Sequence, residues 1–360
     1  MSPTIQSIFK ANKNYCKDHL FGRKKLVFQH LLNCKTIKCG MNSTQCENCG
    51  EHVTHYNSCR DRHCPQCQAI PREVWSFKQR SQVLNIQYFH VVFTLPHELN
   101  ELVLIYPKEM YDLLFDTVAD TLNELSEDEK YLGAQIGFTS VLHTWGQNLS
   151  LHPHLHVIVS GGGHKGKVTW VDSKKNFFLP VRVLSKKFRG KFLDQLKKSE
   201  FFDLDDDENK KLINICYQKE WVVYSKEPFE NPEAVIKYLS RYTHRIAISN
   251  GRILNHENHQ VTFKYKDYKD GNKIKEMTLD EEEFIRRFFL HVLPKGFSKI
   301  RHYGFLSSSN KKARLAILKK LTNTPILPSH DLPHKEIVKI VMKKIEYVCP
   351  HCHCAMHKRE

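Results

Sequence analysis

The chain is of moderate length and strongly basic, with 360 residues and a formal net charge of +16. This length predicts two or three folded units, and a hydrophobic content of 41% excludes global disorder. Such a basic surface favours a polyanionic partner, of which nucleic acid is the commonest. No apolar run could span a bilayer and the N-terminus lacks the apolar core of a signal peptide. We therefore expect a cytoplasmic protein that does not bind membranes.

Helices, a cysteine-rich segment and strands are predicted in chain order over the first half. Helix-like apolar spacing up to Leu31 precedes residues 34–67, which are dense in Cys, His, Asn and Gly. A helix is expected over 98–125. The glycines at 161–163 are expected to end a strand that pairs with 168–171 as a hairpin. Three segments rich in aromatic and β-branched residues are predicted strands: 88–95, 138–144 and 155–160.

The second half predicts hairpins and further helices. Thr278 followed by Glu281 predicts a capping box at the start of a helix that ends before Pro294. Strands and helices therefore alternate with hairpins, which favours an α+β fold with an antiparallel sheet. Two turn signals between alternating apolar runs predict hairpins: Asn250-Gly251 and Asp270-Gly271.

Cysteines cluster in C-x-x-C pairs, and without an export signal this favours metal binding over disulfides. The spacing between the first two pairs is that of zinc ribbons and knuckles, in which each pair sits on a tight turn. We predict one structural zinc ion on four thiolates: Cys46, Cys49, Cys64 and Cys67. Several neighbours could replace a member of this set or hold a second ion: Cys34, Cys39, Cys59, His52, His55 and His63.

Cys349 and Cys352 form another C-x-x-C pair near the C-terminus, next to Cys354 and several histidines. One pair alone indicates either a second zinc site or an ordinary exposed tail. A zinc deaminase is excluded, because those enzymes need H-x-E and P-C-x-x-C motifs, whereas this chain has the order Cys-Pro-Gln-Cys and no suitably placed H-x-E.

Histidines alternate at the start of the third predicted strand. Alternate side chains of a strand share a face, so His154 and His156 point the same way while Leu155 points into the core. Two adjacent imidazoles on a sheet are a natural pair of metal ligands, which predicts a divalent-metal site. Residues on the predicted helix that carries Tyr238 and Tyr242 could supply a third ligand. Three residues nearby in sequence could also do so: His143, Gln147 and His152.

A helix is predicted to start at Asn231, a capping residue, followed by Pro232 at a favourable first position. Tyr238 and Tyr242 are four residues apart on this helix and project from one face. Such a pair alone would usually pack in a core. The surrounding basic residues suit a phosphate better than a dry core: Arg241, His244 and Arg245.

The histidine pair and the tyrosine pair together predict a specific chemistry. A phenol has a pKa near 10 and needs activation, and a divalent cation on the histidines would polarise a scissile phosphate. Tyrosine attack yields a 5′-phosphotyrosine and a free 3′-hydroxyl, so rejoining requires no nucleoside triphosphate. The chain accordingly has no G-x-x-x-x-G-K-[ST] loop. Two tyrosines allow two successive exchanges, as strand transfer requires.

With these motifs the chain resembles the two-tyrosine HUH-class rolling-circle transposases of the insertion-sequence 91 type. The resemblance implies an HUH-type antiparallel sheet with flanking helices and a small N-terminal zinc-binding domain. The segments that carry it follow the family's order: NSCRDRHCPQCQ (57–68), FTLPHEL (93–99), LHTWGQNLSLHPHLHVIVSGGG (142–163), YLSRYTHRIAISNGRI (238–253) and RHYGFL (301–306).

The resemblance implies that His154 and His156 are the HUH metal ligands, with Mg²⁺ or Mn²⁺ as cofactor. It implies Tyr238 and Tyr242 as nucleophiles that nick and rejoin single-stranded DNA during rolling-circle transposition. The expected partners are single-stranded or hairpin DNA at the transposon ends and target DNA, in the nucleoid of a prokaryotic cell. The implied zinc ligands are those predicted above: Cys46, Cys49, Cys64 and Cys67.

We expect three regions. Residues 1–80 form a zinc-binding DNA-recognition domain, 85–305 the HUH catalytic domain, and 306–360 a basic C-terminal tail with a possible second metal site. The alternative for each of the arginines expected to contact phosphate is an ordinary solvated side chain. The four residues are Arg241, Arg245, Arg252 and Arg301.

Three other interpretations compete. A replication initiator or relaxase would share the chemistry, but the zinc domain and RHYGFL favour a transposase. A histidine-triad hydrolase would account for His152, His154 and His156, but Pro153 fits poorly and the tyrosine pair would be unexplained. A zinc-ribbon DNA-binding protein without enzymatic activity accounts for the charge and the cysteines, but not for the histidine strand.

Overall fold

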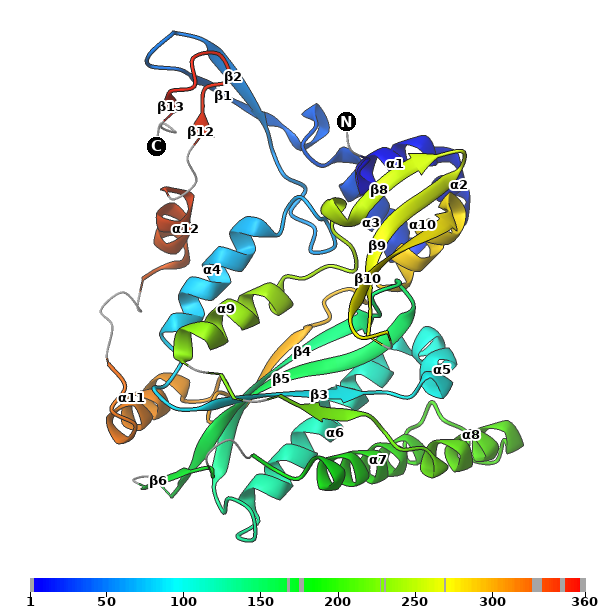
Figure 1. Ribbon diagram of the computed structural model, residues 1–360, viewed down its shortest axis with the longest axis vertical. Coiled ribbons are helices and arrows are strands. Elements are labelled where there is room, and N and C mark those ends of the chain that lie inside the picture. The colour runs from blue at the N-terminus through cyan, green and yellow to red at the C-terminus, as the bar shows by residue number, and fades with distance from the viewer. Residues whose placement is uncertain are drawn as a thin grey trace.

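The protein is built around an antiparallel sheet with the strand order β11-β4-β5-β3-β7, and β6 pairs with β5 (Figure 1). This computed structural model describes residues 3–166, 169–174, 178–226, 228–229, 231–268, 270–325, 332–343 and 347–356. The α+β fold is confirmed. The sheet strands are β3 (Tyr88–Thr94), β4 (Gln135–Trp145), β5 (Leu151–Lys165), β6 (Thr169–Asp172), β7 (Val223–Ser225) and β11 (Ile300–Gly304).

The two faces of this sheet differ. One face carries Phe89, Phe93 and Leu155 into the main core, where helices cover it. On the opposite face, Ile158 packs against Val235 of α9 (Pro232–Thr243), and α4 (Ala69–Arg80) lies beside α9. Helices that follow β3 and β6 in the chain cover the first face: α5 (Asn100–Ile105), α6 (Pro107–Glu127), α7 (Val181–Lys197) and α8 (Asp207–Gln218).

A second core joins the start of the chain to the segment after α9. The ring of Phe9 lies 5.3 Å from those of Phe288 and Phe289, centroid to centroid. The N-terminal helices therefore pack on a later part of the chain and do not form a core of their own. Its elements are α1 (Ile5–Ala11), α2 (Lys13–His19), α3 (Gly22–Asn33), β8 (Ile253–Glu257), β9 (Gln260–Asp267), β10 (Lys273–Asp280) and α10 (Glu281–Leu290).

Two small hairpins from opposite ends of the chain lie side by side (Figure 1). The expected basic tail is folded in its described part, where α11 packs Leu315 and Leu318 on Phe305. No helix in the described ranges is long and apolar enough to cross a membrane. The remaining elements are η1 (Ile37–Cys39), β1 (Met41–Gln45), β2 (His52–Tyr56), η2 (His97–Leu99), η3 (Asn250–Arg252), α11 (Lys311–Leu321), α12 (His334–Lys343), β12 (Tyr347–Val348) and β13 (Ala355–Met356).

The three predicted strands are confirmed as β3, β4 and β5, but β5 does not stop at the glycines. It continues to Lys165 between β4 and β6, because glycines leave room for the neighbouring backbone segments to approach closely. A Cβ on Gly161 would lie 2.7 Å from the carbonyl oxygen of Gln87, and one on Gly163 would lie 2.6 Å from that of Gln135. The predicted hairpin with β6 is confirmed, although Val168 lies outside the described residues.

The predicted helix over 98–125 is divided. Tyr106 adopts a non-helical backbone conformation, and Pro107 starts α6 at a position where proline needs no hydrogen-bond donor. The predicted hairpin at Asn250-Gly251 is wrong, since these residues form η3. The hairpin between β8 and β9 instead turns at Asn258 and His259, which have φ values of 50° and 57°.

The hairpin at Asp270-Gly271 is confirmed between β9 and β10. The helix before Pro294 is also confirmed, but its predicted capping box is wrong. Thr278 belongs to β10, where its hydroxyl lies 2.9 Å from that of Thr262, and α10 starts at Glu281 without a side-chain cap. Cross-strand pairing therefore prevails over the local capping signal.

We expect Gly304→Ala to destabilise the protein more than Gly271→Ala. Both glycines have positive φ values, 59° and 58°, so both substitutions cost about 1 kcal/mol of backbone strain. A Cβ at Gly304 would in addition collide with the carbonyl of Ile136, whereas nothing lies within 4 Å at Gly271. Thermal melting of the zinc-loaded proteins should show a further loss of about 2 kcal/mol for Gly304→Ala. Equal melting temperatures would contradict this packing.

Candidate active site and cysteine clusters

Three histidines meet on the sheet face that carries α9. In the antiparallel pairing of β4 with β5, His143 lies opposite His154, and His156 follows two residues later on the same face. One nitrogen from each of the three rings lies within 4.8 Å of the others. Of the candidates for a third ligand, the structure thus brings His143 to the pair, whereas His152 is exposed and Gln147 donates to the hydroxyl of Tyr268 at 3.3 Å.

Each of these imidazoles has one nitrogen held by a hydrogen bond. Nδ1 of His154 donates to the carbonyl of His152 at 2.7 Å, and Nε2 of His143 donates to the carbonyl of Tyr242 at 2.9 Å. Nδ1 of His156 lies 2.9 Å from Nε2 of His90. The second nitrogen of each ring remains for a ligand, which is the usual arrangement of metal-binding histidines. The three residues therefore fit a divalent metal ion.

Burial keeps the three rings neutral. Loss of solvent lowers the pKa of His154 to about 3 and holds the pKa values of His143 and His156 well below their usual range. The neutral imidazole is the form that binds a metal, so the site needs no deprotonation at physiological pH.

The tyrosine helix starts as predicted, because Oδ1 of Asn231 accepts the N–H of Ala234 at 2.8 Å. Tyr238 and Tyr242 stack with their ring centroids 4.2 Å apart. The ring of Tyr242 lies 4.4 Å from that of His156. Both phenols therefore lie on the histidine side of the helix, although they are far apart from the histidines in the sequence.

His90 of β3 is a site residue that the sequence interpretation missed. Its Nε2 bonds His156, and both of its ring nitrogens lie 3.1 Å from the hydroxyl of Tyr238. The side chain is only 2% exposed, and burial lowers its pKa to about 3. Strand alternation turns His90 away from the core residues Phe89 and Val91, but its role became visible only with the pairing of β3 and β5.

An open groove of about 560 Å³ runs beside the tyrosines. The guanidinium of Arg245 lies 5.8 Å from the ring centroid of Tyr242 and lines this groove. Arg252 also lines it, but donates to the carbonyls of Lys264 and Gln147, which helps to order the backbone. The side chain of Arg241 lies outside the described part of the chain. Residues of α4 and the turn before it also line the groove: Pro65, Gln68, Ala69 and Arg72.

The expected role of Arg301 is corrected by its position. Arg301 pairs with Ser140 across β11 and β4, on the face that α6 covers. There its guanidinium forms an ion pair with Asp112 and lies 4.2 Å from the ring centroid of Phe115. It is therefore neutralised on the side of the sheet opposite the tyrosines, and does not belong to this site.

The four cysteines expected to share one ion lie in two separate clusters. Cys64 and Cys67 meet Cys34 and Cys59, with sulfur distances of 3.4 Å from Cys34 to Cys67 and 3.6 Å from Cys59 to Cys67. Cys46 and Cys49 meet the C-terminal pair instead. The single predicted set is thus corrected: the end of α3 brings Cys34 to the 59–67 turn, whereas β1 and β2 extend away from it (Figure 1).

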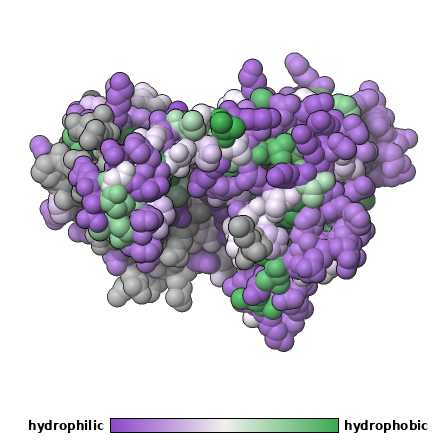
Figure 2. Space-filling model, turned by 90° about the horizontal axis from the view of Figure 1, so that it is seen from above, coloured by the Kyte–Doolittle hydropathy of each residue, from purple (hydrophilic) through white to green (hydrophobic). Residues whose placement is uncertain are grey.

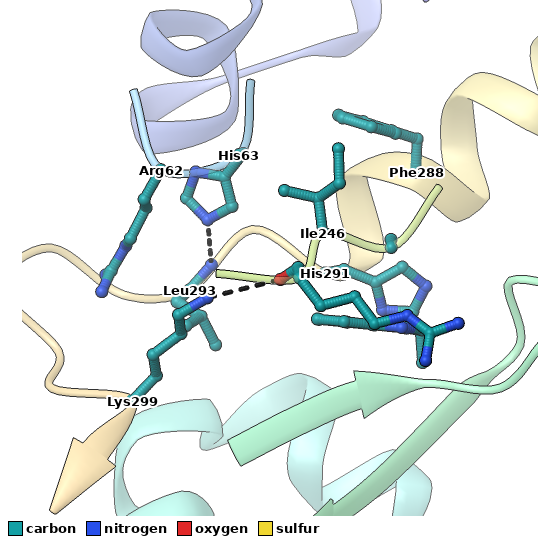
Figure 3. A pocket seen from close by; sticks show the side chains of 10 residues that line it. Arg62, His63, Ile246, Phe288, His291, Leu293 and Lys299 are labelled. Atoms are coloured by element: carbon teal, nitrogen blue, oxygen red, sulfur yellow. Dashed lines mark hydrogen bonds between the residues drawn. The ribbon is translucent and has the colours of Figure 1, made fainter. Parts of the chain in front are cut away.

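The 59–67 turn is fixed to the segment between α10 and β11. Arg62 donates to the carbonyl of Pro294 at 3.2 Å, and Nε2 of His63 accepts the N–H of Leu293 at 3.3 Å. Figure 3 shows the small pocket between them, where Lys299 donates to the carbonyl of Arg245 at 3.4 Å. Burial lowers the pKa of Lys299 to about 8. These contacts set the position of the cysteine turn relative to the tyrosine groove.

Figure 2 shows the molecule from above, where hydrophilic side chains cover most of this face and a notch separates two lobes. Together with the formal net charge of +16, this surface suits a large anionic partner. A cysteine-rich module beside a sheet that carries three histidines, with two tyrosines on the adjoining helix, is an arrangement that suits an enzyme acting on DNA.

The comparisons with known proteins agree. Residues 137–314 match the family described as "Putative transposase" (Y2_Tnp), and residues 6–95 match the family described as "Transposase zinc-binding domain" (Zn_Tnp_IS91). The chain belongs to the IS91-type transposases. The zinc-binding domain and the cysteine clusters support a structural zinc in it. No solved structure matches the chain.

Two relatives illustrate this membership. "Putative transposase y4qJ" of Sinorhizobium fredii is 41% identical over 98% of this chain and 93% of its own length. "Transposase for insertion sequence element IS801" of Pseudomonas savastanoi pv. phaseolicola is 27% identical over 84% of this chain and 76% of its own length.

The histidine cluster makes a prediction for metal binding. His143→Ala should weaken Mn²⁺ binding by more than about 100-fold, because it removes one of three protein ligands. His152→Ala, which changes an exposed neighbour outside the cluster, should bind Mn²⁺ like the unchanged protein. Calorimetric titration of the zinc-loaded proteins measures both affinities. If the two variants bind equally well, His143 is not a ligand.

Proposed function

We propose that this transposase nicks and rejoins single-stranded DNA at element ends through a 5′-phosphotyrosine, in rolling-circle transposition. The observation that carries the proposal is the position of Tyr238 and Tyr242 over the cluster of His143, His154 and His156. This combination supplies a nucleophile and a metal site on one side of the sheet. Single-stranded or hairpin DNA at the ends and target DNA would occupy the groove.

The chemistry is a transesterification. The hydroxyl oxygen of one tyrosine attacks the scissile phosphorus while the bond from phosphorus to the 3′-oxygen breaks. The tyrosine loses one proton, and the leaving 3′-oxygen gains one. A bound Mg²⁺ or Mn²⁺ would stabilise charge on the phosphate oxygens. Because hard ions prefer oxygen ligands, those phosphate oxygens would complement the three imidazoles. Arg245 can contact the same phosphate from the groove.

His90 is proposed as a positioning residue that links the metal ligand to one nucleophile. A metal on Nε2 of His156 requires a proton on Nδ1, which then donates to Nε2 of His90. His90 must therefore carry its own proton on Nδ1 and can donate it to the oxygen of Tyr238. Burial is the main cause that raises the pKa of Tyr238, and its hydrogen bond with Tyr242 raises it further. A hydrogen-bond donor to the Tyr238 oxygen would therefore favour the phenolate.

The two tyrosines can be tested by covalent trapping. Labelled single-stranded DNA carrying the element end should form a denaturant-resistant adduct with the protein in Mg²⁺ or Mn²⁺. Chelator should abolish the adduct, and so should His154→Ala. The double variant Tyr238→Phe/Tyr242→Phe should also form no adduct. The two single variants show which tyrosine acts on that strand. Tyr224→Phe, which changes an exposed tyrosine of β7, is the matched control.

Tight DNA binding without any adduct would contradict the proposed chemistry and favour a zinc-dependent DNA-binding protein. Adducts that persist in the double variant would require another nucleophile.

His90→Ala should slow adduct formation through Tyr238 by about 10- to 100-fold, because one hydrogen-bond donor to the reacting oxygen is lost. Adduct formation through Tyr242, measured in Tyr238→Phe, should change less. Mn²⁺ affinity should fall modestly, since His90 only orients His156. His90→Gln keeps a side-chain donor and should restore part of the rate. If His90→Ala slows adduct formation equally through both tyrosines, His90 acts only through the metal ligand His156.

A further inference from the structure

The hairpin of β1 and β2 meets the C-terminal hairpin of β12 and β13 at four cysteines. Cys46 and Cys49 lie in the turn between β1 and β2, and Cys349 and Cys352 lie in the turn between β12 and β13. The four sulfur atoms lie within 4.8 Å of one another. The C-terminal pair lies outside both matched family segments, which cover residues 6–95 and 137–314.

The two turns have the same backbone geometry. The N–H of Cys46 donates to the carbonyl of Glu51 at 2.8 Å, and the N–H of Gly50 donates back to the carbonyl of Cys46 at 2.9 Å. In the second turn, the N–H of Cys349 donates to the carbonyl of Cys354 at 2.9 Å, and that of His353 donates to the carbonyl of Cys349 at 2.9 Å. Each turn therefore presents its two thiols in the same direction.

The residue after each C-x-x-C pair adopts a positive φ, 71° at Gly50 and 58° at His353. Glycine takes this conformation freely, but a histidine does so at a cost of backbone strain. The strained backbone at His353 reproduces the turn that Gly50 makes easily. The second turn is thus shaped as a metal-binding knuckle and not as an ordinary chain end.

We infer that Cys46, Cys49, Cys349 and Cys352 bind one zinc ion and form a zinc ribbon split between the β1-β2 hairpin and the C-terminal β12-β13 hairpin. In a tetrahedral site with bonds of about 2.3 Å, neighbouring sulfur atoms are roughly 3.8 Å apart. Here the distances are 3.6 Å from Cys46 to Cys352 and 3.7 Å from Cys49 to Cys349. These are far longer than a disulfide bond, and all four cysteines are free.

The ion would hold the C-terminal segment against the wall of the tyrosine groove. From the knuckle the chain leads back to α12, whose Ile337 and Val341 pack on Val74 of α4. The other side of α4 contacts α9, and Trp75 packs in the cluster that contains Leu239. A helix of ten residues with so few buried contacts is marginal by itself. The zinc would therefore keep α12 in place beside α4, on the side away from α9 (Figure 1).

Zinc content of the full chain tests the shared site. Elemental analysis is done in the His154→Ala background, so that zinc bound by the histidine cluster does not enter the count. Together with the Cys34 cluster, we then expect two zinc ions per chain. Cys349→Ser with Cys352→Ser should leave one, and Cys46→Ser with Cys49→Ser should also leave one. All four substitutions together should still leave one, because both pairs serve the same ion. Two cysteines outside both clusters provide the controls, and Cys39→Ser and Cys354→Ser should each retain two.

A measurement on the unchanged protein guards against variants that fail to fold. On titration with chelator, Cys46, Cys49, Cys349 and Cys352 should become reactive to alkylation together, separately from the Cys34 cluster. Cys352→His should keep two ions, because histidine can replace one thiolate. Hydrogen exchange over 334–343 should rise at least about tenfold when the C-terminal pair is changed, with 311–321 unaffected.

Two zinc ions in the variant that lacks Cys349 and Cys352 would overturn the inference. A quadruple variant that loses more zinc than either double variant would do the same, as would alkylation of the two pairs at different chelator concentrations. Neither metal content nor hydrogen exchange depends on strand transfer, so this result stands apart from the proposed chemistry.

Discussion

The pairing of β4 with β5 is the constraint on which the site depends. Partners across an antiparallel pair share a face, so the register that sets His143 opposite His154 also places His156 beside them. A slip of one residue would turn His143 towards the apolar core under α6. The neighbouring pairing of β3 with β5 then brings His90 to His156. The apolar side chains on the opposite face hold these registers, since each would lose its buried contacts on slipping.

None of the residues that line the groove is a cysteine, and the two cysteine clusters lie outside it. The cluster at Cys34 lies in the turn whose Arg62 and His63 dock on the segment after α10. The cluster at Cys46 lies where the β1-β2 hairpin meets the C-terminal hairpin, beyond α12 and α4. Between them runs α4, whose Ala69 and Arg72 line the groove together with the two tyrosines. Because α4 contacts both α12 and α9, metal binding at the Cys46 cluster would affect the position of the tyrosine helix.

Local periodicity determined much of the site. Alternation along one strand places His154 and His156 on one face, and a spacing of four places Tyr238 and Tyr242 on one side of a helix. Asn231 starts that helix through a hydrogen bond within its first turn. Such features involve only neighbours in sequence, so they could be predicted before the fold was known. The same holds for the zinc-type C-x-x-C turns, since their backbone geometry is set within a few residues.

Only the tertiary structure decided which of these local pieces meet. Cys64 and Cys67 join Cys34 and Cys59, and the 46–49 pair joins the C-terminal one, because the path of the chain selects partners across large separations. Arg301 faces away from the site since its pairing in the sheet sets its side. By itself the sequence determined the residue types, turns and faces that can bind metal and carry a nucleophile. Strand order and register decided which side chains share a site, because those depend on buried contacts between segments distant in the chain.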